Sequence, residues 1–234
     1  MRTKVRIVFA VAFFAAACQT TDTVRIDNIP MYGQPEVERP AELKRADEDF
    51  IRDAMKGFST RREASTAWWL KGERHMEDRN LDYAMRRFNQ SWLLDPTNFG
   101  PYWGFGRVLL EQDKQAEAVK QFEAAVERLD NPKYEVALLV DAATAYAFNG
   151  ERLMDQNSAD RAAANFAKAN ETYARAAKLQ PDNGNIYRRW AIARYLEKDY
   201  AAAWSNVKRG RMLGEHQWPR GFLESLSASM PEPR

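Results

Sequence analysis

The sequence predicts an all-α fold made of stacked helical hairpins, and three observations support this prediction. From residue 41 onward the chain has no alternating β-branched runs bounded by turns, which strands would show. Good helix formers, above all alanine, glutamate, arginine, lysine and leucine, dominate the same region. The segment 68–96 also aligns with the segment 102–130 at a constant offset of 34 residues, so the chain contains an internal repeat.

Five aligned positions define the repeat, and they combine aromatic with small side chains. The pairs are Trp68 with Tyr102, Gly72 with Gly106, Ala84 with Ala118, Phe88 with Phe122, and Ser91 with Ala125. The small residues let two helices lie close together, and the phenylalanines fill the space between one unit and the next. This period and these residue types resemble the tetratricopeptide repeat (TPR), in which each unit is two antiparallel helices, A and then B. The resemblance implies a right-handed TPR-type solenoid.

A fourth unit follows the same template near the C-terminus. Tyr187 lies six residues after Pro181, the same spacing as between the proline and the tyrosine at the first junction. Ala191 and Ala203 are twelve residues apart, like the glycine and alanine of the first two units. The four TPR-like units together are expected to span residues 59–213.

The third unit departs from the template. Its helix-A small residue is assigned to Ala143 and its helix-B alanine to Ala169, which makes their separation 26 residues instead of twelve. The excess of 14 residues is two heptads, so seven residues added to each helix would keep the same faces in contact. We therefore expect elongated helices that project from the solenoid, with a tip near residues 155–160 and Ser158 as the N-cap. A loop or a short extra helix is the alternative.

Both ends of the solenoid need covers, because terminal repeats otherwise expose their stacking faces. An amphipathic N-terminal helix is predicted over residues 41–58. Thr60 and Glu63 have the spacing of a capping box at the start of the first helix A. A C-terminal capping helix and tail are predicted over residues 214–234.

The first residues have the features of an export signal. Three basic residues precede residues 7–17, an apolar run of eleven residues that is too short to cross a bilayer. Residues 15–18 resemble the lipobox of bacterial lipoproteins, although Ala15 stands where that family usually has leucine. The resemblance implies that residues 1–17 are a lipoprotein signal peptide and that Cys18 becomes triacylated. The alternative is a plain cleaved signal in which Cys18 is incidental.

Residues 18–40 are predicted to be a lipidated tether between the membrane and the repeats. Prolines and a glycine recur there without a helical apolar stripe. Fully extended, residues 19–40 would reach about 70 Å. In the alternative arrangement, the apolar residues of 29–35 dock on the folded domain. Gln19 is not the aspartate that retains many such lipoproteins in the inner membrane, so we expect lipid anchoring at the periplasmic face of the outer membrane.

The charge balance argues against nucleic acid as a partner. Removing residues 1–17, which carry three positive and no negative charges, takes the net charge from +2 to −1. Residues 186–220 carry eight basic and three acidic side chains, which would suit an acidic partner or anionic headgroups. The alternative is ordinary solvated charge on helix faces.

The mature sequence shows no signature of catalysis. Its only histidines are His75, expected to pack inside the first unit, and His216, expected at the surface. It contains no HExxH, no cysteine–histidine cluster, no phosphate-binding loop and no GxSxG elbow. We therefore expect a protein that is not an enzyme and that holds no metal and no cofactor.

The resemblance to TPR proteins assigns the inner, concave wall to helices A. The positions carried over from that family are Trp69, Glu73 and Met76, then Trp103, Arg107 and Leu110, then Val140, Thr144 and Ala147, and finally Arg188, Ile192 and Tyr195. Among these, Trp69, Glu73, Trp103, Arg107, Arg188 and Tyr195 are the predicted partner-binding residues, because tryptophan, tyrosine and arginine are favoured interface anchors. In the alternative, Trp69 and Trp103 pack against neighbouring helices or against residues 29–32.

The sequence thus predicts a membrane-anchored TPR scaffold or adaptor lipoprotein that binds a protein or peptide in its concave groove during a bacterial envelope process. The alternative function is a periplasmic carrier, or an enzyme accessory, that binds a small apolar ligand at Trp69 and Trp103.

Overall fold

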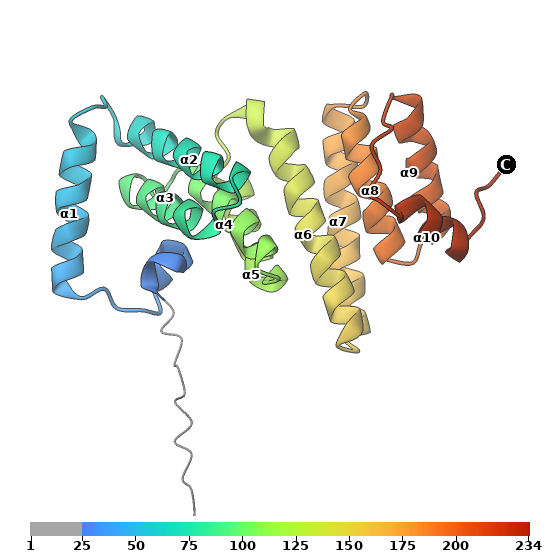
Figure 1. Ribbon diagram of the computed structural model, residues 1–234, viewed down its shortest axis with the longest axis horizontal. Coiled ribbons are helices and arrows are strands. Elements are labelled where there is room, and N and C mark those ends of the chain that lie inside the picture. Colours follow the sequence, from blue (N-terminus) through green and yellow to red (C-terminus); the bar gives the residue numbers. More distant parts are fainter. Residues whose placement is uncertain (1–24) are drawn as a thin grey trace, which may run out of the picture.

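The computed structural model describes residues 25–234, and within them the chain is helical, with no strand (Figure 1). Ten α-helices and three short 3₁₀ helices follow one another along this part of the chain. They are η1 (Ile26–Asn28), η2 (Pro30–Gly33), α1 (Ala41–Met55), α2 (Arg61–Glu77), α3 (Leu81–Leu94), α4 (Phe99–Glu111), α5 (Gln115–Arg128), η3 (Pro132–Tyr134), α6 (Glu135–Asp155), α7 (Ala159–Leu179), α8 (Gly184–Leu196), α9 (Tyr200–Met212) and α10 (Phe222–Ser229).

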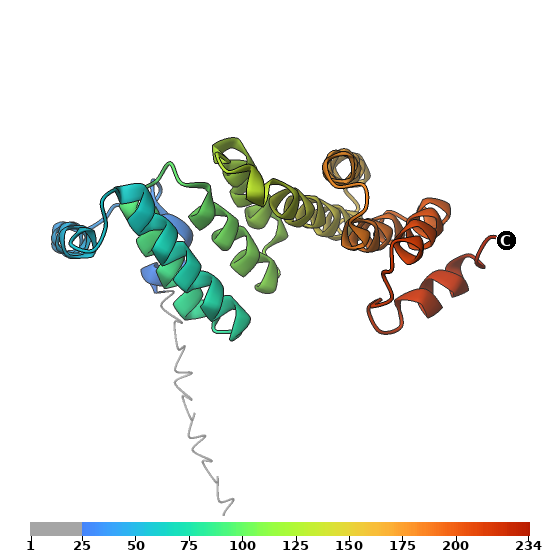
Figure 2. The same cartoon turned by 90° about the horizontal axis from the view of Figure 1, so that it is seen from above.

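Eight of these helices form four antiparallel hairpins, α2–α3, α4–α5, α6–α7 and α8–α9, which stand side by side in a curved row (Figures 1 and 2). Each first helix contacts the first helix of the next hairpin, and each second helix packs against the hairpin that follows. The fold is therefore an all-α, TPR-type solenoid, as the sequence predicts. The predicted covers are also helical, with α1 at one end and α10 at the other.

The tips of the four hairpins share one backbone conformation. Each tip has a non-glycine residue with positive φ, and the next N–H donates to a carbonyl five residues earlier, which ends the first helix. A small residue lies seven positions before the positive-φ residue and an alanine five positions after it. The four sets are Gly72, Arg79 and Ala84; Gly106, Asp113 and Ala118; Gly150, Asn157 and Ala162; and Ala191, Lys198 and Ala203.

The third hairpin is the long one, and its register corrects the sequence assignment. Helices α6 and α7 have 21 residues each, and their tip extends past that of α8–α9 (Figure 1). A Cβ added to Gly150 would lie 3.0 Å from the ring of Phe166, the same contact that Gly106 makes with Phe122 at 2.8 Å. The close glycine–phenylalanine contact is thus made near the tip and not by Ala143.

Two helix starts were predicted from capping residues. The capping box of Thr60 and Glu63 is confirmed, because the Thr60 hydroxyl accepts from the Glu63 N–H and the Glu63 carboxylate accepts from the Thr60 N–H. Ser158 is the N-cap residue of α7, but its side chain makes no capping hydrogen bond. The hairpin tip already determines the backbone there, since the Ser158 N–H donates to the Leu153 carbonyl at 2.9 Å.

Residues 25–39 dock on the first hairpin, which is the alternative to a free tether. We call this segment the strap. Its Tyr32 is buried, and its Met31 packs against the core that contains Phe88. Both Met31 and Tyr32 have left-handed backbone angles, which cost roughly 1–2 kcal/mol each for non-glycine residues. Burial and the hydrogen bonds of the strap offset that cost.

Candidate partner-binding groove

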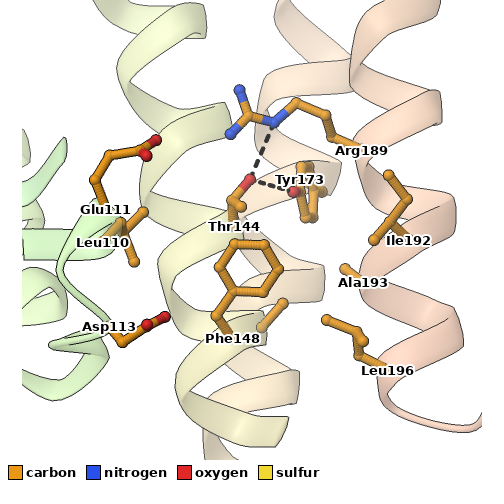
Figure 3. A pocket seen from close by; sticks show the side chains of 11 residues that line it. Leu110, Glu111, Asp113, Thr144, Phe148, Tyr173, Arg189, Ile192, Ala193 and Leu196 are labelled. Carbon is orange, nitrogen blue, oxygen red and sulfur yellow. Dashed lines mark hydrogen bonds between the residues drawn. The ribbon is translucent and has the colours of Figure 1, made fainter. Parts of the chain in front are cut away.

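The concave wall of the solenoid contains a pocket between three of the first helices, α4, α6 and α8 (Figure 3). Its volume is about 390 Å³. Successive first helices of the hairpins contact each other, so their inward side chains form one continuous surface. The pocket is a hollow in this surface.

The floor of the pocket is apolar. Its side chains are short or only half-buried, so carbon surface remains accessible to a bound group. They are Leu110 from α4, Ala147 and Phe148 from α6, and Ile192, Ala193 and Leu196 from α8. Burial of an apolar side chain here would therefore be favourable at about 25 cal/mol per Å² of surface removed from water.

One wall of the pocket is a hydrogen-bonded network centred on Arg189. Its guanidinium pairs with Asp141 at 2.8 Å and donates from Nε to the Thr144 hydroxyl at 3.1 Å. The Thr144 hydroxyl lies 2.7 Å from the hydroxyl of Tyr173, as Figure 3 shows. Burial raises the pKa of the Tyr173 phenol above its ordinary value. The network holds Arg189 in one position and neutralises its charge with Asp141.

The opposite rim carries two carboxylates, Glu111 and Asp113, at the end of α4 (Figure 3). Both side chains are exposed, and within residues 25–234 neither forms a salt bridge. Because Arg189 is already paired, the rim leaves the pocket with two uncompensated negative charges. An apolar floor with an acidic rim suits a ligand that combines an apolar group with a cation.

Trp69 and Trp103 are buried, at 3% and 8% exposure, so the packing alternative is correct for both. Their rings lie 5.8 Å apart and pack against Phe99 and Tyr134, from the start of α4 and from η3. The Trp103 indole donates to Asp141 at 2.8 Å. The partners are the neighbouring helices, whereas the strap lies on α3. Little of either ring remains exposed, and Trp69 borders a second hollow, of about 340 Å³, together with Phe99 and Tyr134.

Glu73 and Arg107 form an ion pair between α2 and α4, 34 residues apart. The Glu73 carboxylate also accepts from the Trp69 indole at 3.2 Å. Burial raises the pKa of Glu73 above its ordinary value, and the attraction of Arg107 offsets this only in part. Both predicted site residues therefore join neighbouring units.

Arg188 and Tyr195 lie at the end of the groove that the C-terminal segment covers. Arg188 donates to the Gln217 carbonyl at 3.0 Å, and the Tyr195 ring packs edge-on against Phe222 of α10 at 5.8 Å. All six predicted partner-binding residues are thus engaged within the chain, and none lines the pocket.

Four other positions carried over from the TPR resemblance, Leu110, Thr144, Ala147 and Ile192, do line the pocket. Sequence reasoning missed its polar wall and its rim, which are formed by Arg189, Tyr173, Glu111 and Asp113. The sequence gives little indication of Arg189, because it is next to a second arginine, Arg188. The two side chains differ only in the side of the helix to which they point.

The two histidines lie where the sequence predicts. His75 is half-buried and its ring packs 5.5 Å from that of Tyr83, whereas His216 is exposed. Across residues 25–234, no group of three or more histidine, cysteine, aspartate or glutamate side chains is arranged to bind a metal. In that same part of the chain, no helix combines the length and apolarity needed to span a membrane.

The basic stretch 186–220 is largely paired within the chain. Five of its eight cations, Arg188, Arg189, Arg194, Arg209 and Arg211, form salt bridges with nearby carboxylates. The ordinary explanation, charge distributed over solvated helix faces, therefore describes this region better than a basic docking surface.

Comparisons with known proteins show the fold alone. No family model and no curated protein matches the chain. Two crystal structures of MamA are similar in structure, one at 16% identity over 82% of this chain and 92% of that one (TM-score 0.50), the other at 15% over 76% and 96% (TM-score 0.49). The APC/C hetero-tetramer Cut9–Hcn1 matches at 15% identity over 81% of this chain and 32% of that one (TM-score 0.48). These are TPR-type helical repeat proteins.

Proposed function

We propose that this protein is a TPR adaptor that binds a segment of a partner protein in the pocket between α4, α6 and α8. The observation that carries the proposal is the pocket itself, about 390 Å³ in volume with an apolar floor on the concave wall of a helical solenoid. Such solenoids form extended concave surfaces that suit a bound chain.

The partner segment that fits best has an apolar side chain next to a lysine or arginine. The apolar side chain would occupy the floor near Ile192 and Ala147, and the cation would face Glu111 and Asp113. Opposite charge at the rim mainly increases specificity and the rate of association, while the apolar group supplies most of the affinity.

The membrane half of the proposal rests on the sequence. Acylation of Cys18, which lies outside the described residues, would anchor the adaptor at the periplasmic face of the outer membrane and place its groove within an envelope process. Three acyl chains would hold it durably, since each buried CH₂ contributes about 0.8 kcal/mol.

Site-specific photo-crosslinking in cells tests the groove. We expect a photoreactive residue at position 192 to attach to a protein partner, and one at Met212, the most exposed large apolar side chain of the described residues, not to do so. Ala147→Leu, which fills the pocket, should abolish the adduct, whereas Ala137→Leu on the exposed face of the same helix should leave it unchanged. Equal adducts from positions 192 and 212 would contradict the proposed site.

The anchor is tested by Cys18→Ser. We expect this variant to remain in the soluble fraction of disrupted cells, while the wild-type protein sediments with the outer membrane. A variant that sediments like the wild type would refute lipid anchoring and would leave the groove proposal unaffected.

The second candidate is a carrier of a small apolar ligand. Trp69 and Trp103, the ligand-binding residues that the sequence predicts for such a carrier, are buried. The pocket between α4, α6 and α8, however, has a volume of about 390 Å³, which lies in the range of small-molecule sites. Mass spectrometry of the purified protein under native conditions separates the candidates. A bound small molecule that Ala147→Leu displaces would favour the carrier.

A further inference from the structure

The helix α6 lines two hollows with opposite sides. Its residues Thr144 and Phe148 line the pocket shared with α4 and α8. Its residues Ala142 and Tyr146 line a hollow of about 430 Å³ that also touches the second helices α5 and α7. Each of the latter lies two residues before one of the former, which is about half a turn of an α-helix. We call this hollow the outer groove, and the body of α6 separates it from the candidate site.

The floor of the outer groove is apolar. Val126 of α5 is half-buried there, and the nearly buried Leu139 and Ala142 of α6 complete the floor. Tyr146 adds a half-buried ring. A large apolar side chain would therefore be stabilised in the groove, because it would leave water for carbon surface.

The charges around the outer groove are unequally paired. The two cations that line it are both engaged, Lys168 with Glu123 at 3.0 Å and Arg175 with Glu135 of α6. Glu171 also lines the groove, and it forms no salt bridge within residues 25–234. A free carboxylate beside an apolar floor suits a ring that carries an N–H donor.

The repeat indicates which side chain the groove lacks. Val126 lies 13 residues after Asp113, the positive-φ residue of its hairpin tip, and the matching residue of the first hairpin is Trp92. The Trp92 ring packs against the core, and its N–H donates to the hydroxyl of Tyr102 in α4 at 3.2 Å. The junction between the first and second hairpins is thus filled by an indole.

The junction between the third and fourth hairpins also contains an indole. The matching residue there is Asn170, which accepts from the N–H of Trp190 in α8 at 2.9 Å. The Trp190 ring stacks on Tyr173 of α7 at 5.9 Å. In the described part of the chain, no tryptophan lines the outer groove. The middle junction therefore lacks the ring that both neighbouring junctions hold.

We propose that the outer groove binds a tryptophan side chain of a partner protein, which takes the role that Trp92 and Trp190 have at the neighbouring junctions. The ring would contact Val126 and Leu139, and its N–H would face the carboxylate of Glu171. The site is separate from the pocket between α4, α6 and α8, so this inference does not rest on the proposed function. It would let one chain hold two partners at once, one on each side of α6.

Fluorine NMR with a tryptophan probe tests the outer groove. The probe is N-acetyl-5-fluorotryptophan amide, whose resonance broadens when it binds. We would use the full chain with Ala147→Leu, which fills the pocket on the other side of α6, and we expect broadening that saturates with a single Kd. N-acetyl-4-fluorophenylalanine amide should bind about fivefold more weakly, because its ring cannot donate a hydrogen bond to a carboxylate.

The main variant is Val126→Trp, which gives the second unit the residue of the first. Probe affinity should fall about tenfold or more, because the added ring occupies the floor, while the circular dichroism spectrum stays unchanged. Lys120→Trp adds the same ring at an exposed position of α5 outside the groove and is the matched control, which should bind like its parent. Thr172→Phe fills the groove from α7 and repeats the test if Val126→Trp does not fold.

The outcomes are distinguishable. No broadening in the Ala147→Leu protein would overturn the site and would leave the proposed function unaffected. Broadening that survives both Val126→Trp and Thr172→Phe would mean that the probe binds elsewhere, which also overturns the site. Equal affinity for the two probes would overturn the assignment of Glu171 as the acceptor of the indole N–H.

Discussion

The two halves of the concave wall use equivalent positions in different ways. One inner-wall position lies ten residues before the positive-φ residue of each hairpin tip. In the four units it is occupied by Trp69, Trp103, Ala147 and Arg188. The two tryptophans fill the half formed by α2 and α4, whereas Ala147 leaves space and the pocket opens beside it. The comparison shows that, in this chain, the large side chains at this position pack between the first helices, whereas the alanine leaves room for the pocket between α4, α6 and α8.

Trp103→Ala should have the largest effect, because it removes a buried ring from the half formed by α2 and α4. Phe or Trp to Ala substitutions in cores cost about 3–5 kcal/mol, and this one also leaves Asp141 without the indole donor. Urea unfolding followed by circular dichroism measures the loss. A cost below about 1 kcal/mol would show that this half is not part of the core.

Gly106→Ala should come next, because a Cβ at Gly106 would lie 2.8 Å from the ring of Phe122. Overpacking of this kind costs typically 1–3 kcal/mol, which outweighs the gain in helix propensity. Gly57→Ala is the matched control, since nothing lies within 4 Å of its added Cβ. Thermal unfolding of both variants would contradict the packing argument if the two midpoints were equal.

Ile192→Ala should have a smaller effect on stability and a large one on function. The side chain is half-buried and lines the pocket, so its truncation should cost about 1 kcal/mol in unfolding free energy. Partner capture by crosslinking should nevertheless fall sharply, because the floor loses its apolar anchor. If Trp103→Ala lost partner binding and Ile192→Ala did not, the partner would bind at the half formed by α2 and α4 and not at the pocket.

Glu73→Gln should have the smallest effect, visible only as a dependence on pH. The folded pKa of Glu73 is raised, so folding favours its protonated form and its contribution to stability falls as pH rises above the ordinary carboxyl value. The glutamine imitates the protonated form. The stability of the variant relative to the wild type should therefore improve between about pH 4 and about pH 7. A change in the opposite direction would mean that Arg107 outweighs the burial of the carboxylate.

The sequence predicts the stacked hairpins well because their determinants are local. The pairs formed by Gly72 with Phe88 and by Gly106 with Phe122 are visible in the spacing alone, and the structure brings each pair into contact. In the third unit, Gly150 has the same spacing of sixteen residues to Phe166. The sequence favours Ala143 as the small residue of this unit because its distance from Gly106 is closer to the 34-residue period than that of Gly150.

The site was harder to predict because its determinants are not local. Trp69 and Trp103 are at the expected inner positions, but Tyr134 reaches them from a connection whose path the sequence does not show. The pocket also includes Tyr173, which comes from the second helix α7 and not from a first helix. Docking of the strap depends on Asn89, a polar residue that the repeat pattern treats as an ordinary helix position.

The strap also imposes an order on maturation of the chain. Most contacts in the solenoid join residues close in sequence, so each hairpin can form as soon as its own residues are available. Residues 25–39 emerge before α3 during synthesis, yet they can dock only after α3 has formed around Asn89, some 60 residues later. Until then Tyr32, which is buried in the folded chain, and the partly buried Met31 remain exposed to solvent.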